Sequence, residues 1–148
     1  MSLMDLMTTR LADLEAPKPV PMGHYLAVVS GPGKIKEFGA DKKEALEYEI
    51  TLLQADEDVD PDILREFGKP IAGIKMLHRV FIADQAGLWR ARQNFFSKLG
   101  VPESVTLAEA NVLAAQKHVK VKITQQAYTL QGGEPQLVAN IAGFVSVE

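Results

Sequence analysis

The alternation of apolar and polar positions along the chain predicts a mainly β domain with one principal helix. Residues 45–54 alternate most clearly, with Leu46, Tyr48, Ile50 and Leu52 on one face and polar side chains on the other. A period of two is typical of a strand that buries one face. We therefore expect Tyr48 to be a core residue.

Four other segments have the composition of strands. Residues 23–30 are rich in β-branched and apolar side chains and end at Gly31-Pro32-Gly33, a strong turn signal. Between this strand and the next we expect a loop that carries Lys34 and Lys36. The remaining strands are predicted at residues 74–82, 118–128 and 137–145.

Residues 85–99 have the strongest helical pattern. Leu88, Ala91, Phe95 and Leu99 recur at spacings of three and four, which predicts a buried stripe. Trp89 and Phe96 lie one stripe over and are expected to plug the end of a barrel. Arg90 and Arg92 are expected to be exposed helix charges. Asp84 is the predicted N-cap of this helix and Gly100 its stop.

Shorter helices are predicted on both sides of this one. Asp60 can cap a helix that begins at Pro61. Thr106 opens a capping box, because a glutamate follows it three residues later. Residues 3–15 are predicted to be either a short amphipathic helical arm or a loosely ordered terminus, and this segment stops at the proline-rich residues 17–21.

The order of these elements is three strands, the main helix and two more strands. This is the order of an OB-fold, a five-stranded Greek-key barrel that often binds single strands or sugars. We predict an N-terminal arm and linker over residues 1–20 and an OB-like domain over residues 21–148. The main helix then lies between the third and fourth strands.

Composition limits the class of protein. The chain has 148 residues, 47% of them hydrophobic, and it has no cysteine, so thiolate metal sites and disulfides are excluded. No apolar run approaches the roughly 18 residues of a membrane span. The N-terminus lacks the basic region and apolar core of a signal peptide. We therefore expect a cytoplasmic protein that does not bind membranes.

The net charge of −3 hides a strong asymmetry. Residues 34–62 hold ten carboxylates and four lysines, whereas residues 69–122 hold nine basic side chains and three carboxylates. The two segments therefore carry net charges of −6 and +6. A basic surface can attract a polyanion even on a mildly acidic protein. Two unrelated solvated surfaces would give the same count, and charge alone does not decide between them.

Motifs for catalysis are missing. The three histidines fall in predicted strands and form no metal-binding helical pair. The glycines and lysines of residues 31–39 lack the spacing of a phosphate-binding loop. The acidic segment 56–62 lacks the glycine of a calcium loop and contains Pro61, so we expect a solvated turn. No sequence feature supports an enzyme or a cofactor.

Binding chemistry is present on the predicted strands. Single-strand binders combine cations that follow the phosphates with flat side chains that stack on bases. The candidate nucleic-acid-binding residues are Lys34, Lys36, Lys75, Arg79, Phe81, Lys120, Lys122 and Tyr128. Alternating lysines such as Lys120 and Lys122 can instead keep a strand edge soluble, and Phe81 can instead be a core residue.

These segments resemble a phage-encoded family of single-stranded-DNA-binding proteins. The similarity is carried by GHYLAVVSGP, EYEITLL, HRVFI, FFSKLGV, TLAEA and HVKVKI, within about residues 21–145. The positions that match the family pattern are Gly23, Tyr25, Phe81, Leu99, Gly100, Val119 and Val121. The resemblance implies an OB-type barrel that coats single-stranded DNA during phage replication or recombination. The N-terminal arm is not part of the pattern.

Two functions therefore remain open at the level of the sequence. The first is a sequence-tolerant single-stranded-DNA-binding protein whose further partners are phage replication or recombination proteins. A homodimer would lengthen its DNA footprint, although no sequence feature requires one. The second is a non-catalytic structural or protein-interaction module, such as a virion or assembly protein. The acidic segment and the apolar arm favour this second function.

Overall fold

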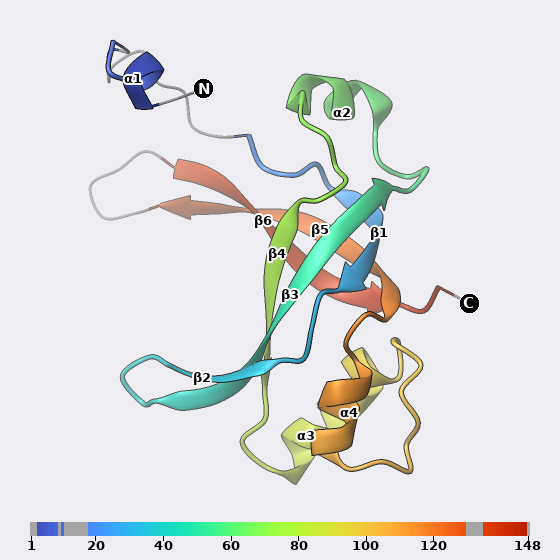
Figure 1. Ribbon diagram of the computed structural model, residues 1–148. Coiled ribbons are helices and arrows are strands. Elements are labelled where there is room, and N and C mark those ends of the chain that lie inside the picture. The colour runs from blue at the N-terminus through green and yellow to red at the C-terminus, as the bar shows by residue number, and fades with distance from the viewer. Residues whose placement is uncertain (1–2, 9, 11–17, 130–134, 148) are drawn as a thin grey trace.

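The computed structural model describes residues 3–8, 10, 18–129 and 135–147, and its main element is an antiparallel sheet (Figure 1). The strands are β1 (Gly23–Val29), β2 (Lys34–Phe38), β3 (Lys43–Ala55), β4 (Lys75–Phe81), β5 (His118–Thr129) and β6 (Pro135–Val145). The helices are α1 (Leu3–Leu6), α2 (Pro61–Phe67), α3 (Gln85–Ala91), the π-helix η2 (Arg92–Phe96) and α4 (Leu107–Leu113). No described helix is long and apolar enough to cross a bilayer.

The strands are ordered β2-β3-β1-β5-β6, and β4 pairs with the other edge of β3. The long β3 therefore joins β4 to the rest of the sheet. Within the described residues β4 and β6 form no backbone pairing, so the predicted barrel is not closed by hydrogen bonds. Side chains approach across the gap instead, since the ring centres of His78 and Phe144 lie 4.6 Å apart.

The predicted strands are present, but the loop expected after the first of them is wrong. Lys34–Phe38 forms β2, an antiparallel hairpin with the start of β3. Gly39 and Lys42 adopt positive φ values of 75° and 50° in the connecting turn. Because β3 extends beyond the edge of β1, its first residues have a free edge on which β2 can pair.

The predicted caps are confirmed. The side chain of Asp60 accepts a hydrogen bond from the backbone of Asp62, and Pro61 begins α2. Asp84 accepts from the backbone of Gly87 in α3. Thr106 accepts from the backbone of Glu109 in α4. These short helices are thus fixed locally, as expected from N-cap chemistry.

The predicted helix over residues 85–99 is divided between α3 and η2. Ala91, Phe95 and Leu99 are buried, but Leu88 is 36% exposed, so the predicted buried stripe is wrong at its first position. Trp89 is 56% exposed and plugs no barrel end, whereas Phe96 is buried. Ala91, before η2, and Leu99, after it, are nevertheless both buried.

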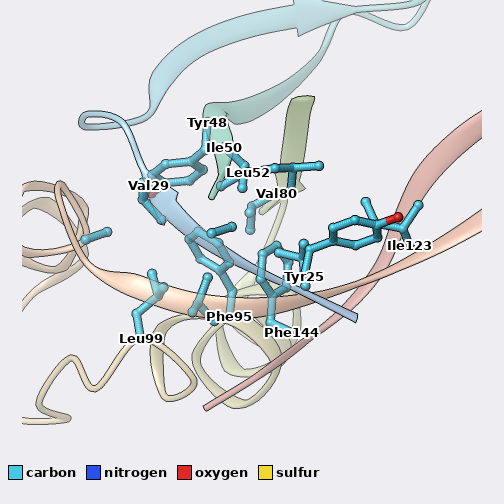
Figure 2. Packing of buried hydrophobic residues seen from close by; sticks show 14 of the residues in the cluster. Tyr25, Val29, Tyr48, Ile50, Leu52, Val80, Phe95, Leu99, Ile123 and Phe144 are labelled. Carbon is cyan, nitrogen blue, oxygen red and sulfur yellow. The ribbon is translucent and has the colours of Figure 1, made fainter. Parts of the chain in front are cut away.

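The core lies between the inner face of the sheet and η2 (Figure 2). Tyr25 and Tyr48 are fully buried, which confirms the prediction for Tyr48. The ring of Phe95 lies 4.7 Å from that of Tyr48 and 5.0 Å from that of Phe144. The hydroxyl of Tyr25 donates to the carbonyl of Pro21, and burial raises the pKa of Tyr25 to about 12.

One asparagine fixes α4 to the beginning of β2. The Asn111 amide oxygen accepts from the backbone of Gly33 at 2.8 Å and from the Tyr48 hydroxyl at 2.6 Å, and its nitrogen donates to the Gly33 carbonyl. A Cβ on Gly33 would lie 2.7 Å from the Tyr48 ring, so this close approach requires glycine.

Candidate nucleic-acid interface

The solvent-facing side of β2, β3 and β4 brings together five of the eight predicted binding residues. Opposite residues in the strand register share a face, and the inner positions of β4 pack towards the core. We call this surface the outer face. Its residues are Lys34, Lys36, Phe38, Lys43, Glu47, Glu49, Lys75, Leu77, Arg79 and Phe81.

Two phenylalanines form the aromatic centre of the outer face. Phe38 and Phe81 meet edge to face with ring centres 5.8 Å apart. Phe81 is 50% exposed, so it is a surface residue rather than a core residue. Arg79 covers the Phe38 ring at 4.0 Å. An exposed ring with a neighbouring cation is the arrangement on which nucleic-acid bases stack.

Carboxylates of β3 neutralise part of the outer face. Glu47, whose side chain is 8% exposed, accepts from Lys36 at 2.7 Å and from Arg79 Nε at 3.2 Å. The hydrogen bond from Lys36 lowers the pKa of Glu47. Lys75 pairs with Glu49 at 3.2 Å. The predicted cations are therefore gathered here, but most of them already have an anionic partner.

A cleft of about 450 Å³ opens between β4, β6 and the α3–η2 helix, and we call it the β4–β6 cleft. Its charged lining residues are Arg79, Arg90 and Lys98, with no carboxylate among the residues described. His78, Phe95 and Phe144 form aromatic lining. Burial lowers the pKa of His78 to about 4, so its imidazole is neutral at pH 7. The charged side chains that line this cleft are therefore all cationic.

A second hollow continues the surface on the other side of Phe81. It shares Phe81 and Arg90 with the β4–β6 cleft and adds Lys42 and Lys43 from the β2–β3 turn. One of its two carboxylates, Asp84, is occupied by its bond to the start of α3. Phe81 therefore lines two neighbouring concavities that both contain cations.

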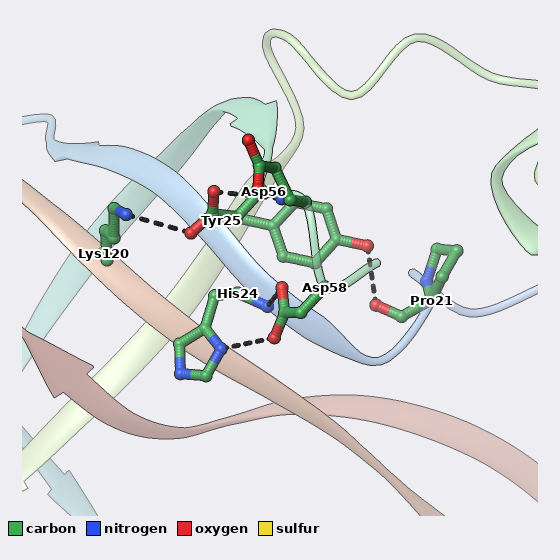
Figure 3. Close-up of polar contacts among 7 residues, drawn as sticks. Pro21, His24, Tyr25, Asp56, Asp58 and Lys120 are labelled. Atoms are coloured by element: carbon green, nitrogen blue, oxygen red, sulfur yellow. Dashed lines mark hydrogen bonds and ion pairs between the residues drawn. The ribbon is translucent and has the colours of Figure 1, made fainter. Parts of the chain in front are cut away.

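The lysines of β5 do not join the group on β4. Strands β3 and β1 lie between β4 and β5. Lys120 pairs with Asp56 at 2.9 Å, and this bond lowers the pKa of Asp56 (Figure 3). Lys122 lies opposite Gly143, which lines the β4–β6 cleft, and has no ion pair with the described residues. Lys120 and Lys122 are thus separated from Lys75 and Arg79 by two strands of the sheet.

Two further predicted residues have different outcomes. Lys34 is exposed on β2, beside a groove between the hairpin and α4, and forms no ion pair with the described residues. The backbone of Tyr128 belongs to β5. Its predicted stacking role lies outside what the structure describes, because the position of its side chain is not described.

The acidic segment after β3 has structural roles. Asp58 accepts from the ring and the backbone nitrogen of His24 at 2.6 and 3.0 Å, and the ring hydrogen bond lowers the pKa of Asp58 (Figure 3). Asp60 caps α2, and Asp62 pairs with Arg65. No three carboxylates or histidines of the described chain are arranged around a common metal position.

Sequence reasoning missed several residues of this surface. Phe38, Arg90 and Lys98 were not among the predicted binding residues, yet they contact or line it. A signal for the helix residues exists, because Arg90, Asn94 and Lys98 recur at a spacing of four and so share one helical face. Phe38 lies on the same face of β2 as Lys34 and Lys36, but the sequence prediction placed these residues in a loop.

Comparisons with known proteins give little support to any family. No protein-family model matches the chain, and no curated protein sequence matches it. A solved structure described as yeast RPA bound to ssDNA is similar over 100% of this chain and 88% of that chain, with 11% sequence identity and a TM-score of 0.33. A similarity this low supports no conclusion about fold or function.

Proposed function

We propose that this chain binds single-stranded DNA without strong sequence preference, through the outer face and the β4–β6 cleft. The observation that carries the proposal is the position of Phe81. This half-exposed residue lines both the β4–β6 cleft, with Arg79, Arg90 and Lys98, and the neighbouring hollow, with Lys42 and Lys43. Bases would stack on Phe81, and the backbone phosphates would follow the cations on both sides.

The fold is consistent with this function. The strand path β4-β3-β1-β5-β6, with α3, η2 and α4 between β4 and β5 in the chain, supports an OB-fold whose first strand would be divided into β1 and β2. Such folds bind single strands on the strands that correspond here to β3 and β4. Within this proposal the protein is a non-catalytic component of phage DNA replication or recombination and needs no cofactor.

The competing function is a protein-interaction module. The observation that favours it is the neutralisation of the outer face, where Glu47 pairs with two of the predicted cations. The described part of the N-terminal arm is apolar and exposed, with Met4 82% accessible. A protein of this kind would not bind oligo-dT even in dilute salt.

Fluorescence anisotropy of labelled oligo-dT separates these functions. The wild-type protein should bind with an affinity that falls steeply with salt, by roughly 0.7 log units per phosphate contact for each log unit of salt. The double variant R90Q/K98Q should lose about two contacts and hence about 1.4 units of this slope. Failure of the wild type to bind at low salt would reject the proposal.

A matched variant controls for the change in net charge. R65Q/K69Q also removes two positive charges, but both residues belong to α2 and the segment after it, which Figure 1 shows at the opposite end of the molecule from α3. The proposal requires R65Q/K69Q to bind like the wild type. Equal losses in the two double variants would mean that only the overall charge matters.

A further inference from the structure

A further pocket, separate from the proposed DNA-binding surface, lies between α3–η2 and α4. Its volume is about 340 Å³, within the range of pockets that hold small ligands or single side chains. The walls are mostly apolar and include Leu88, Trp89, Phe96 and Val101. Arg90 faces the β4–β6 cleft, whereas the neighbouring Trp89 and Arg92 line this pocket. The two surfaces therefore lie on different sides of one helix.

Arg92 is the unusual residue of this pocket. Its Nε is buried and has no hydrogen-bond partner among the described residues. A buried donor without an acceptor destabilises the fold unless a ligand supplies the acceptor. Glu103 is the carboxylate that lines the same pocket, but it forms no ion pair with Arg92. The Arg92 Nε–H thus lies at a largely apolar pocket without a hydrogen-bond acceptor among the described residues.

The backbone at Arg92 is also unusual. Arg92 begins η2, where the backbone nitrogen of Ser97 donates to the Arg92 carbonyl at 2.9 Å, five residues away. Such π-helical turns are rare and occur frequently at functional sites. The turn changes the helical phase between Trp89 and Phe96, yet both of these side chains line the pocket with Arg92.

The chemistry of the pocket indicates what would fill it. A guanidinium binds a carboxylate through two parallel hydrogen bonds, and the surrounding walls suit an apolar group. Leu88 and Trp89 are 36% and 56% exposed at the rim, and exposed tryptophan is characteristic of protein-binding hot spots. A polyanion fits poorly, because the pocket offers one cation and also contains Glu103.

We propose that this pocket binds an acidic, apolar segment of a partner protein. An apolar side chain of the partner fills the space between Trp89 and Val101, and a neighbouring carboxylate accepts from Arg92. This inference is independent of DNA binding, because none of its residues belongs to the outer face or the β4–β6 cleft.

The single tryptophan of the chain is a direct reporter, because Trp89 lies in the pocket. The probe is a short capped peptide with a single aspartate flanked by leucine and phenylalanine. It should change Trp89 emission saturably in the wild-type protein. A peptide with asparagine in place of aspartate should bind at least tenfold more weakly. The absence of a saturable change, or equal binding of both peptides, would overturn the proposal.

Two variants with the same loss of charge test the role of Arg92. Arg92→Gln should weaken the aspartate peptide at least tenfold and leave oligo-dT binding unchanged. Arg90→Gln should do the reverse. If both variants weaken the peptide equally, the effect comes from net charge and the proposal fails. Failure of oligo-dT binding in the wild type would refute only the DNA function.

Two further measurements test the proposal in the wild-type protein. The first does not depend on the stability of Arg92→Gln, and the second uses a small amphipathic acid in place of the peptide. In wild-type protein the NMR signal of the Arg92 Nε–H should shift when the aspartate peptide is added, and an unmoved signal would contradict the contact. Free decanoate presents a carboxylate on an apolar chain without a peptide. It should bind more weakly than the peptide. Tighter binding of decanoate would replace the protein partner with a small amphipathic acid and overturn the proposal.

Discussion

Arg79 lies over the ring of Phe38, with 4.0 Å between the guanidinium carbon and the ring centre. The two residues belong to β4 and β2, which flank β3 without pairing with each other. Ala45 of β3 is buried on the same face, and its small side chain leaves room for the contact. The Nε of Arg79 also donates to Glu47. Glu47 therefore orients the cation and, at the same time, neutralises it.

Glu47→Gln should strengthen binding to oligo-dT. The substitution removes a negative charge beside Lys36 and Arg79, so both cations become available to phosphates. We expect a gain of roughly 3- to 10-fold at low salt and a steeper salt dependence, by up to about one phosphate contact. Anisotropy titrations at several salt concentrations measure both quantities.

Glu57→Gln is the control for this experiment. Glu57 is exposed in the turn after β3, and its carboxylate forms no ion pair with the described residues. Glu57→Gln should leave the salt dependence of oligo-dT binding unchanged. Weaker binding by Glu47→Gln would show that orientation of Arg79 matters more than its free charge.

Phe81→Ala tests base stacking. Loss of one stacked base should cost about 1–3 kcal/mol, or roughly 5- to 150-fold in affinity. The salt dependence should stay the same, because no charge is removed. Val112→Ala on α4 is a suitable control, since Val112 is 65% exposed and lies outside both the outer face and the β4–β6 cleft. An unchanged affinity of Phe81→Ala would remove the aromatic part of the interface.

Local signals in the sequence were sufficient for most elements. The caps at Asp60, Asp84 and Thr106 depend on side chains within three residues of the helix start, so they are readable from sequence. The alternation around Tyr48 depends only on the pleat of one strand. The confirmed predictions therefore all rest on short-range geometry.

The charge pattern could not be predicted, because it depends on strand register. The acidic and basic segments looked like separate surfaces, but β3 and β4 pair so that Glu47 lies opposite Arg79. Lys120 likewise meets Asp56, which is 64 residues away in the chain. A shift of one residue would have placed these side chains on opposite faces. One sequence contains no direct record of that register.

The π-helix η2 could not be predicted from the sequence either. The π-helical turn at Arg92–Phe96 has no signature in the apolar spacing, so a continuous α-helix was expected. Leu88, predicted in the buried stripe, and Trp89, predicted to plug a barrel end, are instead exposed. The prediction of a continuous helix also concealed the pocket at Arg92, whose two walls belong to helices on both sides of a loop.

Stability should fall as the pH is lowered from about 7 to 4, because of His78. Its pKa is lowered from 6.5 to about 4 by burial against Phe95 and Phe144. The unfolded chain therefore binds a proton below pH 6.5 that the folded protein does not bind until about pH 4. The contribution of neutral His78 to the free energy of unfolding is complete above pH 6.5. Up to about 3 kcal/mol of this free energy is lost by pH 4.

Urea unfolding at about pH 7.5, 6 and 5 measures this loss of stability. His78→Phe cannot take up the proton, so its stability should depend less on pH than that of the wild type. His118→Phe is the control, because His118 is exposed on β5. Identical pH profiles for the wild type and His78→Phe would show that other groups dominate acid unfolding.

Asn111→Ala should destabilise the fold without affecting DNA binding. The substitution leaves both backbone groups of Gly33 and the hydroxyl of Tyr48 without the partner that they have now. Since a buried unpaired group costs about 1–3 kcal/mol and some of these groups will find water, we expect a loss of roughly 2–4 kcal/mol. Urea unfolding followed by circular dichroism measures this loss as a lower midpoint with an unchanged slope.

Tyr48→Phe should cost only about 1 kcal/mol, because it removes one hydrogen bond of the network, and the two substitutions should be less than additive. Asn140→Ala, which removes an exposed contact to Gln126, should change the midpoint little. Additive losses in the double variant would mean that Asn111 and Tyr48 stabilise the protein independently.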